Sequence, residues 1–134
     1  MKIKVTGKSA VRTCTAPYID PDTRQKHTIT VEYYSHTQAA TKKLMADAEK
    51  EDADYQKRVE KAEKDGKPPP KRFIFSMTRS LLWVLHGLPD FSTPDDKPFA
   101  ITEANLDLLT FENLQAIDQA IKDDIEAKKS KPAE

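Results

Sequence analysis

The fold is decided by the segment Phe73-Ile74-Phe75-Ser76-Met77-Thr78-Arg79-Ser80-Leu81-Leu82-Trp83-Val84-Leu85-His86, which is apolar on nearly every side when it is projected as a helix. A surface helix needs only one apolar stripe, so a helix that is apolar all round has to be covered by other elements. We therefore predict a central helix here, too short and, with Arg79 inside it, too polar to span a bilayer. We expect it to end at Gly87 in a left-handed C-terminal cap, with His86 bonding carbonyls in the last turn.

Two more helical segments follow in the chain and are expected to cover the central helix. Thr102 is a suitable N-cap for a helix from Glu103 to Leu109. Thr110 is a suitable N-cap for a last helix. The apolar residues of that helix recur at spacings of three and four and give it one apolar face: Leu114, Ile117, Ile121 and Ile125. Residues 73–128 are therefore predicted to form a compact helical core.

The first 34 residues are typical of strands. Lys2 to Thr6 alternates polar and apolar residues, Ala10 to Thr15 does so more weakly, and Thr28 to Tyr34 is dense in β-branched and aromatic residues. Asp20-Pro21-Asp22 has the chemistry of a turn, because proline presets one backbone angle and aspartate can bond its own backbone. We predict an N-terminal β-hairpin or small antiparallel sheet with one face on the helices, since two or three strands alone are marginally stable.

A long polar helix is predicted over residues 35–66. Ser35 and Gln38 fit a capping box at its start, and Gly66 and the prolines after it end it. Small apolar residues recur along it at helical spacing: Ala40, Leu44, Ala48, Tyr55, Val59 and Ala62. The remaining positions are mostly charged and of mixed sign. Residues 67–72, with three consecutive prolines, are expected to form a stiff spacer.

The function of this helix has three interpretations. It is a solvated arm whose charges only keep it soluble, or a docking arm in which the alanines with Tyr55 and Val59 form a narrow seam for another helix, or a partly disordered segment.

Composition limits the class of protein. A chain of 134 residues suggests a single domain over residues 1–134, and we predict an α+β fold that is predominantly α-helical. The 22 basic and 22 acidic residues cancel, so no overall field attracts nucleic acid or an anionic membrane. No signal peptide is visible, and the lone Cys14 rules out an internal disulfide and fits a reducing interior.

Residues with catalytic or metal-binding potential are few and scattered. The three histidines and Cys14 have no metal-ligand spacing, and the three glycines form no phosphate-binding loop. The loop from Pro89 to Pro98 holds three aspartates but lacks the ligand spacing and central glycine of an EF-hand. We therefore expect no catalytic residues, no metal and no cofactor, and we predict a non-enzymatic protein that acts by contact with other proteins.

The order of these features resembles that of the tail assembly chaperones of long-tailed, siphovirus-type bacteriophages. The resemblance rests on a β-rich start ending in Thr28-Ile-Thr-Val-Glu-Tyr-Tyr-Ser-His, an apolar Leu81-Leu82-Trp83-Val84-Leu85-His86-Gly87-Leu88, an acidic loop with Asp95-Asp96-Lys97-Pro98-Phe99, then Ile101 to Leu109 and a final helix from Ala116 to Ile125. It is clearest over Leu81 to Ile125, about a third of the chain. The charged residues from Asp47 to Lys67 and the prolines have no counterpart in the family pattern.

The resemblance implies a protein of the host cell cytoplasm that binds the tape measure protein and helps the major tail protein assemble around it. Such a protein leaves before the tail is finished and is absent from the mature virion. The resemblance also implies a homo-oligomer and a longer product made by ribosomal frameshifting, with which Lys128-Lys129 is compatible. Neither nucleic acid nor membrane is expected as a partner.

Five residues are candidates for partner binding: Tyr55, Val59, Trp83, Phe91 and Phe99. Aromatic side chains supply large contact areas at interfaces, but the three later residues are also suited to the core or its edge. A different interpretation of the chain is a small helical adaptor or regulatory protein, one form of which is a homodimer joined through the seam of alanines with Tyr55 and Val59. A nucleic-acid-binding regulator ranks last, because the basic cluster of Lys67, Lys71 and Arg72 is short.

Overall fold

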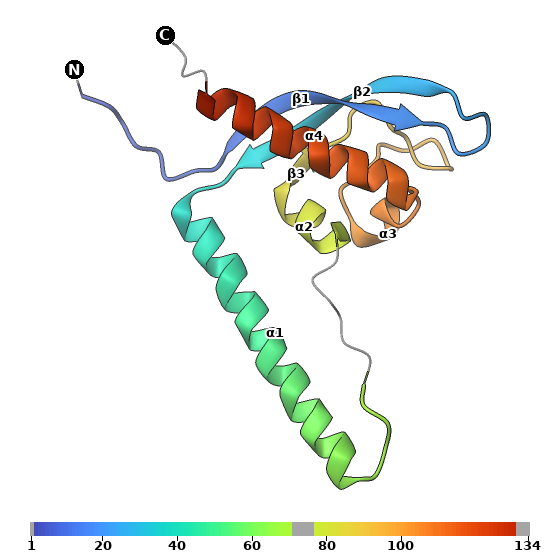
Figure 1. Cartoon of the computed structure of the whole chain (residues 1–134). Helices are drawn as coiled ribbons and strands as arrows, with labels where there is room; N and C mark the ends of the chain where they lie inside the picture. The colour runs from blue at the N-terminus through green and yellow to red at the C-terminus, as the bar shows by residue number, and fades with distance from the viewer. Residues whose placement is uncertain (1, 71–76, 131–134) are drawn as a thin grey trace. The chain divides into compact units, whose positions relative to one another are not determined.

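The computed structural model of the chain describes residues 2–70 and 77–130 (Figure 1). The chain divides into two compact units, one of Met1–Ser9 with His36–Ile74 and one of Ala10–Ser35 with Phe75–Glu134. Each unit is described by itself below. The single domain predicted over residues 1–134 stays a prediction.

The second unit contains a three-stranded antiparallel sheet. β1 (Ala10–Ile19) and β2 (Lys26–Ser35) form a hairpin in which Ala10 pairs with Ser35 and Ile19 with Lys26, and β3 (Leu85–Gly87) pairs with the other edge of β2. The predicted small antiparallel sheet is therefore confirmed, and so is the α+β fold class.

The turn of this hairpin follows the predicted chemistry. The Oδ1 atom of Asp20 accepts hydrogen bonds from the backbone N–H groups of Asp22, at 2.8 Å, and Thr23, at 3.0 Å. These bonds fold the chain back on itself. Arg24 then takes a left-handed conformation with φ 61° and donates its N–H to the Asp20 carbonyl at 2.9 Å.

The predicted strand from Lys2 to Thr6 is wrong. In the structure these residues have no strand pairing, and Ile3 and Val5 are 81% and 87% exposed. Gly7 follows with a positive φ of 71°. Alternation alone does not make a strand, because a strand also needs a neighbour that satisfies its backbone groups.

The predicted central helix is correct in part. α2 comprises Met77–Val84, but Leu85–Gly87 continues as β3, so the predicted cap at Gly87 and the predicted helix-end position of His86 are wrong. The physical reason is pairing with the edge of β2, where Leu85 lies opposite Tyr33 and has its side chain buried. The part of the predicted helix at residues 73–76 lies outside the described residues.

The two later helices begin as predicted. α3 (Glu103–Leu106) starts at Thr102, whose side chain accepts from the Asn105 N–H at 3.2 Å, and it ends three residues earlier than expected. α4 (Phe111–Ser130) starts after Thr110, which accepts from the Asn113 N–H at 3.3 Å. Both predicted caps are therefore confirmed.

The core of this unit lies where α4 packs on β1 and β2 and where α2 meets α3 and α4 (Figure 1). Tyr33 of β2, Leu81 of α2, Leu106 of α3 and Ile117 of α4 are all fully buried. Leu114 and Ile121 are also buried, which confirms the predicted apolar face of the last helix and the predicted packing of the sheet against helices.

The first unit contains the long charged helix. α1 (Gln38–Lys64) is capped by Thr37, which accepts from the Ala40 N–H at 3.3 Å. The predicted capping box at Ser35 is wrong, because Ser35 still belongs to β2. Gly66, with φ 65°, ends the helix as expected. Within this helix, all of which the structure describes, no residue is buried.

Across the described ranges, no helix is both long enough and apolar enough to cross a membrane.

Candidate interaction surfaces

The five predicted contact residues fall into two groups that belong to different units. Tyr55 and Val59 lie on α1, in the first unit, and both are half-buried. Trp83 lies on α2, and Phe91 and Phe99 lie in the segment after β3, all in the second unit. The two groups therefore belong to different units, and each is described by itself.

The surface on α1 is a narrow seam, which we define as Leu44, Ala48, Tyr55, Val59 and Ala62. These are half-buried positions on an otherwise exposed stretch of the helix, and they recur at helical spacing. The Tyr55 hydroxyl donates a hydrogen bond to the Pro70 carbonyl at 3.3 Å, so the chain that follows the helix holds this ring in place. The seam is apolar, but its side chains are small.

The aromatic residues of the second unit form a cluster at the edge of the core. Phe91 packs edge-on against Tyr18, with ring centres 5.1 Å apart, and against Phe99, with ring centres 5.5 Å apart. All three are half-buried and contact the buried core residues. The prediction that Phe91 and Phe99 are core-edge residues is confirmed, while their role as partner anchors stays a prediction. Trp83 is half-buried on α2.

The loop that carries these phenylalanines is closed on itself. Ser92 and Pro98 form an isolated bridge, and the Thr93 N–H donates to the Lys97 carbonyl at 2.9 Å. The Thr93 hydroxyl also donates to Asp95 at 2.6 Å. Asp95 thus serves an ordinary turn, whereas Asp90 accepts a hydrogen bond from the Thr30 N–H of β2 at 2.6 Å. Among the described residues, no group of three His, Cys, Asp or Glu side chains is placed to hold a metal ion.

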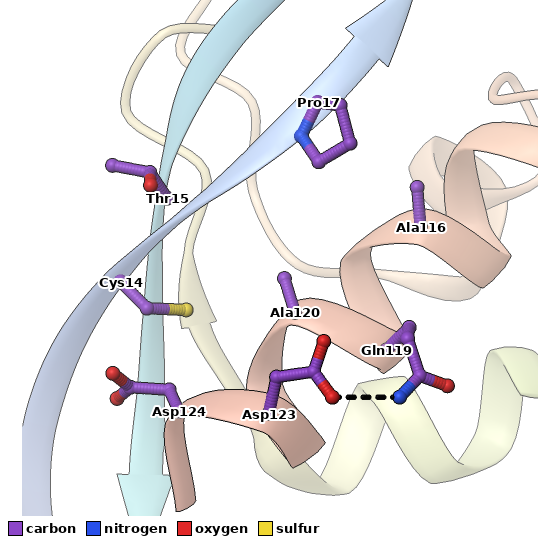
Figure 2. Close-up of a pocket in the computed structure, with 8 residues that line it drawn as sticks. All are labelled: Cys14, Thr15, Pro17, Ala116, Gln119, Ala120, Asp123 and Asp124. Atoms are coloured by element: carbon purple, nitrogen blue, oxygen red, sulfur yellow. Dashed lines mark hydrogen bonds between the residues drawn. The ribbon is translucent and has the colours of Figure 1, made fainter. Parts of the chain in front are cut away.

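A groove between β1 and α4 was not predicted from the sequence (Figure 2). It has a volume of about 630 Å³ and is open to solvent. Its lining comes from both elements: Cys14, Thr15, Pro17, Ala116, Gln119, Ala120, Asp123 and Asp124. About a hundred residues separate its two walls in the sequence, so no local pattern could have revealed it.

The two carboxylates at one end of the groove accept hydrogen bonds from neighbouring side chains. Asp124 accepts hydrogen bonds from the Tyr33 hydroxyl at 2.5 Å and from the Lys128 ammonium at 2.7 Å. Burial by itself raises the pKa of Asp124, but these hydrogen bonds and the charge of Lys128 outweigh it, so the net pKa is lowered. The neighbouring Asp123 accepts from the Gln119 amide at 2.8 Å (Figure 2).

The thiol in the groove has the character of a packing residue. Cys14 is half-buried and contacts the core. Burial raises the pKa of its thiol, and the charge of Asp124 raises it further. A raised pKa keeps the group protonated and weakly nucleophilic near neutral pH. The groove therefore offers a mixed apolar and polar lining, in which the thiol is not an activated nucleophile.

Comparison of the chain with models of protein families, with curated proteins and with solved structures found no match in any of the three.

Proposed function

We propose that this protein is a bacteriophage tail assembly chaperone that binds a tape measure protein and promotes assembly of the tail tube. The observation that carries the proposal is α1, a helix of 27 residues without one buried side chain, which presents an apolar seam to its surroundings. Such a helix is stabilised little by packing against its own chain, and it is suited to pairing with another helix. The resemblance described above supplies the identity of that helix.

The seam suits a long helical client. Alanines at Ala48 and Ala62 let a second helix approach closely, and Tyr55 and Val59 supply the larger contacts. The charged residues of α1 are of mixed sign, and their charges largely cancel. Contact therefore does not depend on one sign of charge in the client. A contact of this kind is shallow and reversible, as a chaperone that leaves the finished tail requires.

The second unit supplies a folded body for this helix. The segment over which the chain resembles the family, Leu81 to Ile125, runs through α2, β3, α3 and α4 of this unit. In the proposed role the aromatic cluster around Phe91 is a further contact, and the major tail protein is a further partner. A homo-oligomer, a frameshifted longer product and residence in the host cytoplasm belong to the same proposal.

The test is co-expression with the long coiled-coil protein encoded just downstream of this gene. We expect that protein to be insoluble alone, to become soluble in the presence of this chain and to co-purify with it. The matched control carries Ala48→Pro and Glu60→Pro, both inside α1. Proline breaks the helix, and both positions lie outside the second unit. Rescue by the control chain, or a client that stays insoluble with both chains, would contradict the proposal.

A second candidate function is a small adaptor that binds a constitutive partner through the same seam. The seam of α1 favours it equally, because a helix seam does not reveal whether contact is transient. The same experiment separates the two functions. An adaptor's partner is soluble alone and stays bound, whereas a chaperone's client aggregates alone and is released when tail tube subunits are added.

A further inference from the structure

The outer edge of β1 carries backbone groups that point away from the sheet. Next to the turn, the Asp20 N–H donates to the Gln25 carbonyl inside the hairpin, while the Asn113 side chain bonds both backbone groups of Ile19 from outside. Because successive residues of a strand direct their backbone groups to opposite sides, every second residue from Ile19 backwards faces outward. These residues are Val11, Thr13, Thr15 and Pro17.

This edge is open over part of its length. The strand order β1-β2-β3 leaves β1 at the edge of the sheet, and among the described residues no strand pairs with its outer side. Asn113 closes the ladder at Ile19, and Pro17 has no N–H to offer. The N–H groups of Val11, Thr13 and Thr15 remain as donors, and those of Thr13 and Thr15 lie beside the groove. An exposed strand edge of this kind is a template for pairing with another chain.

The groove beside this edge lies between β1 and α4 (Figure 2). A strand added to β1 would direct every second side chain toward α4. There it would meet Ala116 and Ala120, whose methyl groups leave the groove about 630 Å³ of room. These alanines are about 6 Å apart along the helix, and alternate side chains of a strand are about 6.8 Å apart, so two apolar side chains would fit over them.

The chain itself contains a segment with this pattern. Lys2 to Thr6 alternates lysine or threonine with Ile3 and Val5, yet it has no strand partner, and both apolar side chains are almost fully exposed. Exposed β-branched side chains at alternate positions are costly in water, and they are suited to a sheet edge beside the apolar part of the groove, at Ala116 and Ala120. Lys2 and Lys4 would then lie on the solvent side of the added strand.

The connection between this segment and β1 is too short for the segment to reach the groove of its own chain. To place both Ile3 and Val5 opposite Cys14 and Ala16 in a hairpin, the chain would have to turn at Ser9 and Ala10. Ala10 is already paired with Ser35 in the sheet. The turn that the residues favour, at Gly7, would place Val5 beside Ala10, outside the groove.

We infer that residues 2–6 of a second copy of this chain add to the outer edge of β1 as a fourth strand, with Ile3 and Val5 in the groove over Ala116 and Ala120. The association would bury two side chains that are now exposed and satisfy the open backbone groups of Thr13 and Thr15. The proposed function also includes a homo-oligomer, but this inference rests on the open edge of β1 and the exposed residues 2–6, so it can fail while client binding holds.

Disulfide trapping between two distinguishable copies tests this pairing. One copy carries Cys14→Ser with either Ile3→Cys or Val5→Cys, and the other is the unchanged chain, whose only cysteine is Cys14. If the added strand is parallel to β1, Ile3→Cys places the new cysteine opposite Cys14. If the added strand is antiparallel, Val5→Cys does so. The control is Lys4→Cys with Cys14→Ser, which directs its thiol to the other face.

We expect one of the two variants to give at least about tenfold more mixed disulfide than the Lys4→Cys control, because a disulfide needs Cβ atoms about 4 Å apart. Yields equal to the control for both variants would overturn the inference. A second measurement uses the native thiol. The reaction of Cys14 with a thiol reagent should slow as protein concentration rises, and a chain lacking residues 2–6 should not show this. Concentration-independent reaction of the unchanged chain would also overturn it.

Discussion

The Asn113 side chain, only 1% exposed, pairs with both backbone groups of Ile19 across 94 positions of sequence. It accepts a hydrogen bond from the Ile19 N–H at 2.9 Å and donates one to the Ile19 carbonyl at 2.9 Å. A buried amide in the first turn of α4 thus imitates a neighbouring strand at the end of β1. This contact fixes where α4 begins relative to the hairpin.

Replacing this amide should destabilise the second unit. Asn113→Ala removes two hydrogen bonds and leaves two backbone groups without their partner, for which we expect a loss of about 2–4 kcal/mol in the free energy of unfolding. Urea denaturation followed by circular dichroism measures this loss. Gln115→Ala, an exposed position in the same helix, is the control and should change stability by less than about 0.5 kcal/mol. Equal losses in the two variants would contradict the role of Asn113.

The contact of Tyr33 with Asp124 predicts how stability depends on acid. The net pKa of Asp124 is lowered below its ordinary value of 3.8, although burial opposes this. A lowered carboxyl pKa contributes stability above the unfolded-state pKa, and this contribution is lost as pH falls through the folded-state pKa. Tyr33→Phe removes one hydrogen bond to the carboxylate, so we expect it to cost about 1–3 kcal/mol at neutral pH.

The same variant should differ less from the unchanged chain in acid. As pH falls through the folded-state pKa of Asp124, the carboxyl group becomes protonated, so the difference in free energy of unfolding between the two chains should shrink. Urea titrations of both chains at neutral pH and in acid check this, and Tyr34→Phe, which leaves Asp124 untouched, serves as the control. A difference that stays constant with pH would show that Tyr33 acts through packing alone.

The features that the sequence predicted are those with local causes. The caps at Thr102 and Thr110, the turn at Asp20 and the apolar face of α4 each depend on residues within a few positions of one another. What the sequence could not predict depends on distant partners. Leu85 is apolar in a helix or in a strand, and only the edge of β2 decides between them. The contact of Asn113 with Ile19 and the groove form only when α4 packs on β1.

Gly87 provides a test of the corrected conformation. In a left-handed cap, alanine would be strained, but Gly87 lies in β3 without a positive φ. A Cβ atom there would meet the Glu32 side chain, with Oε1 at 2.6 Å and Cδ at 3.8 Å, and that carboxylate ends a flexible side chain. We expect Gly87→Ala to cost less than about 1 kcal/mol. In a Glu32→Ala background this cost should disappear, and a cost that persists there would point to backbone strain instead.

The seam of α1 predicts a separation between binding and stability. Tyr55 and Val59 lie one turn apart on a helix in which no described residue is buried, so Tyr55→Ser with Val59→Ser should change the free energy of unfolding of the second unit by less than about 0.5 kcal/mol. In the proposed complex the same side chains are the largest contacts of the seam. Their loss should weaken binding to the client at least about tenfold, since truncating an interface anchor costs about 1–2 kcal/mol.

The matched control for the seam is Lys57→Ser with Lys61→Ser, two exposed residues with the same spacing on another face of α1. It removes two charges, yet we expect the affinity for the client to change by less than about twofold, because exposed charges that lie outside an interface contribute little to binding. Pull-down of the co-expressed client, quantified against a dilution series, compares the variants. If the lysine pair weakens binding as much as the seam pair, the client is held by charge, and the helix-pairing mechanism proposed for α1 is wrong.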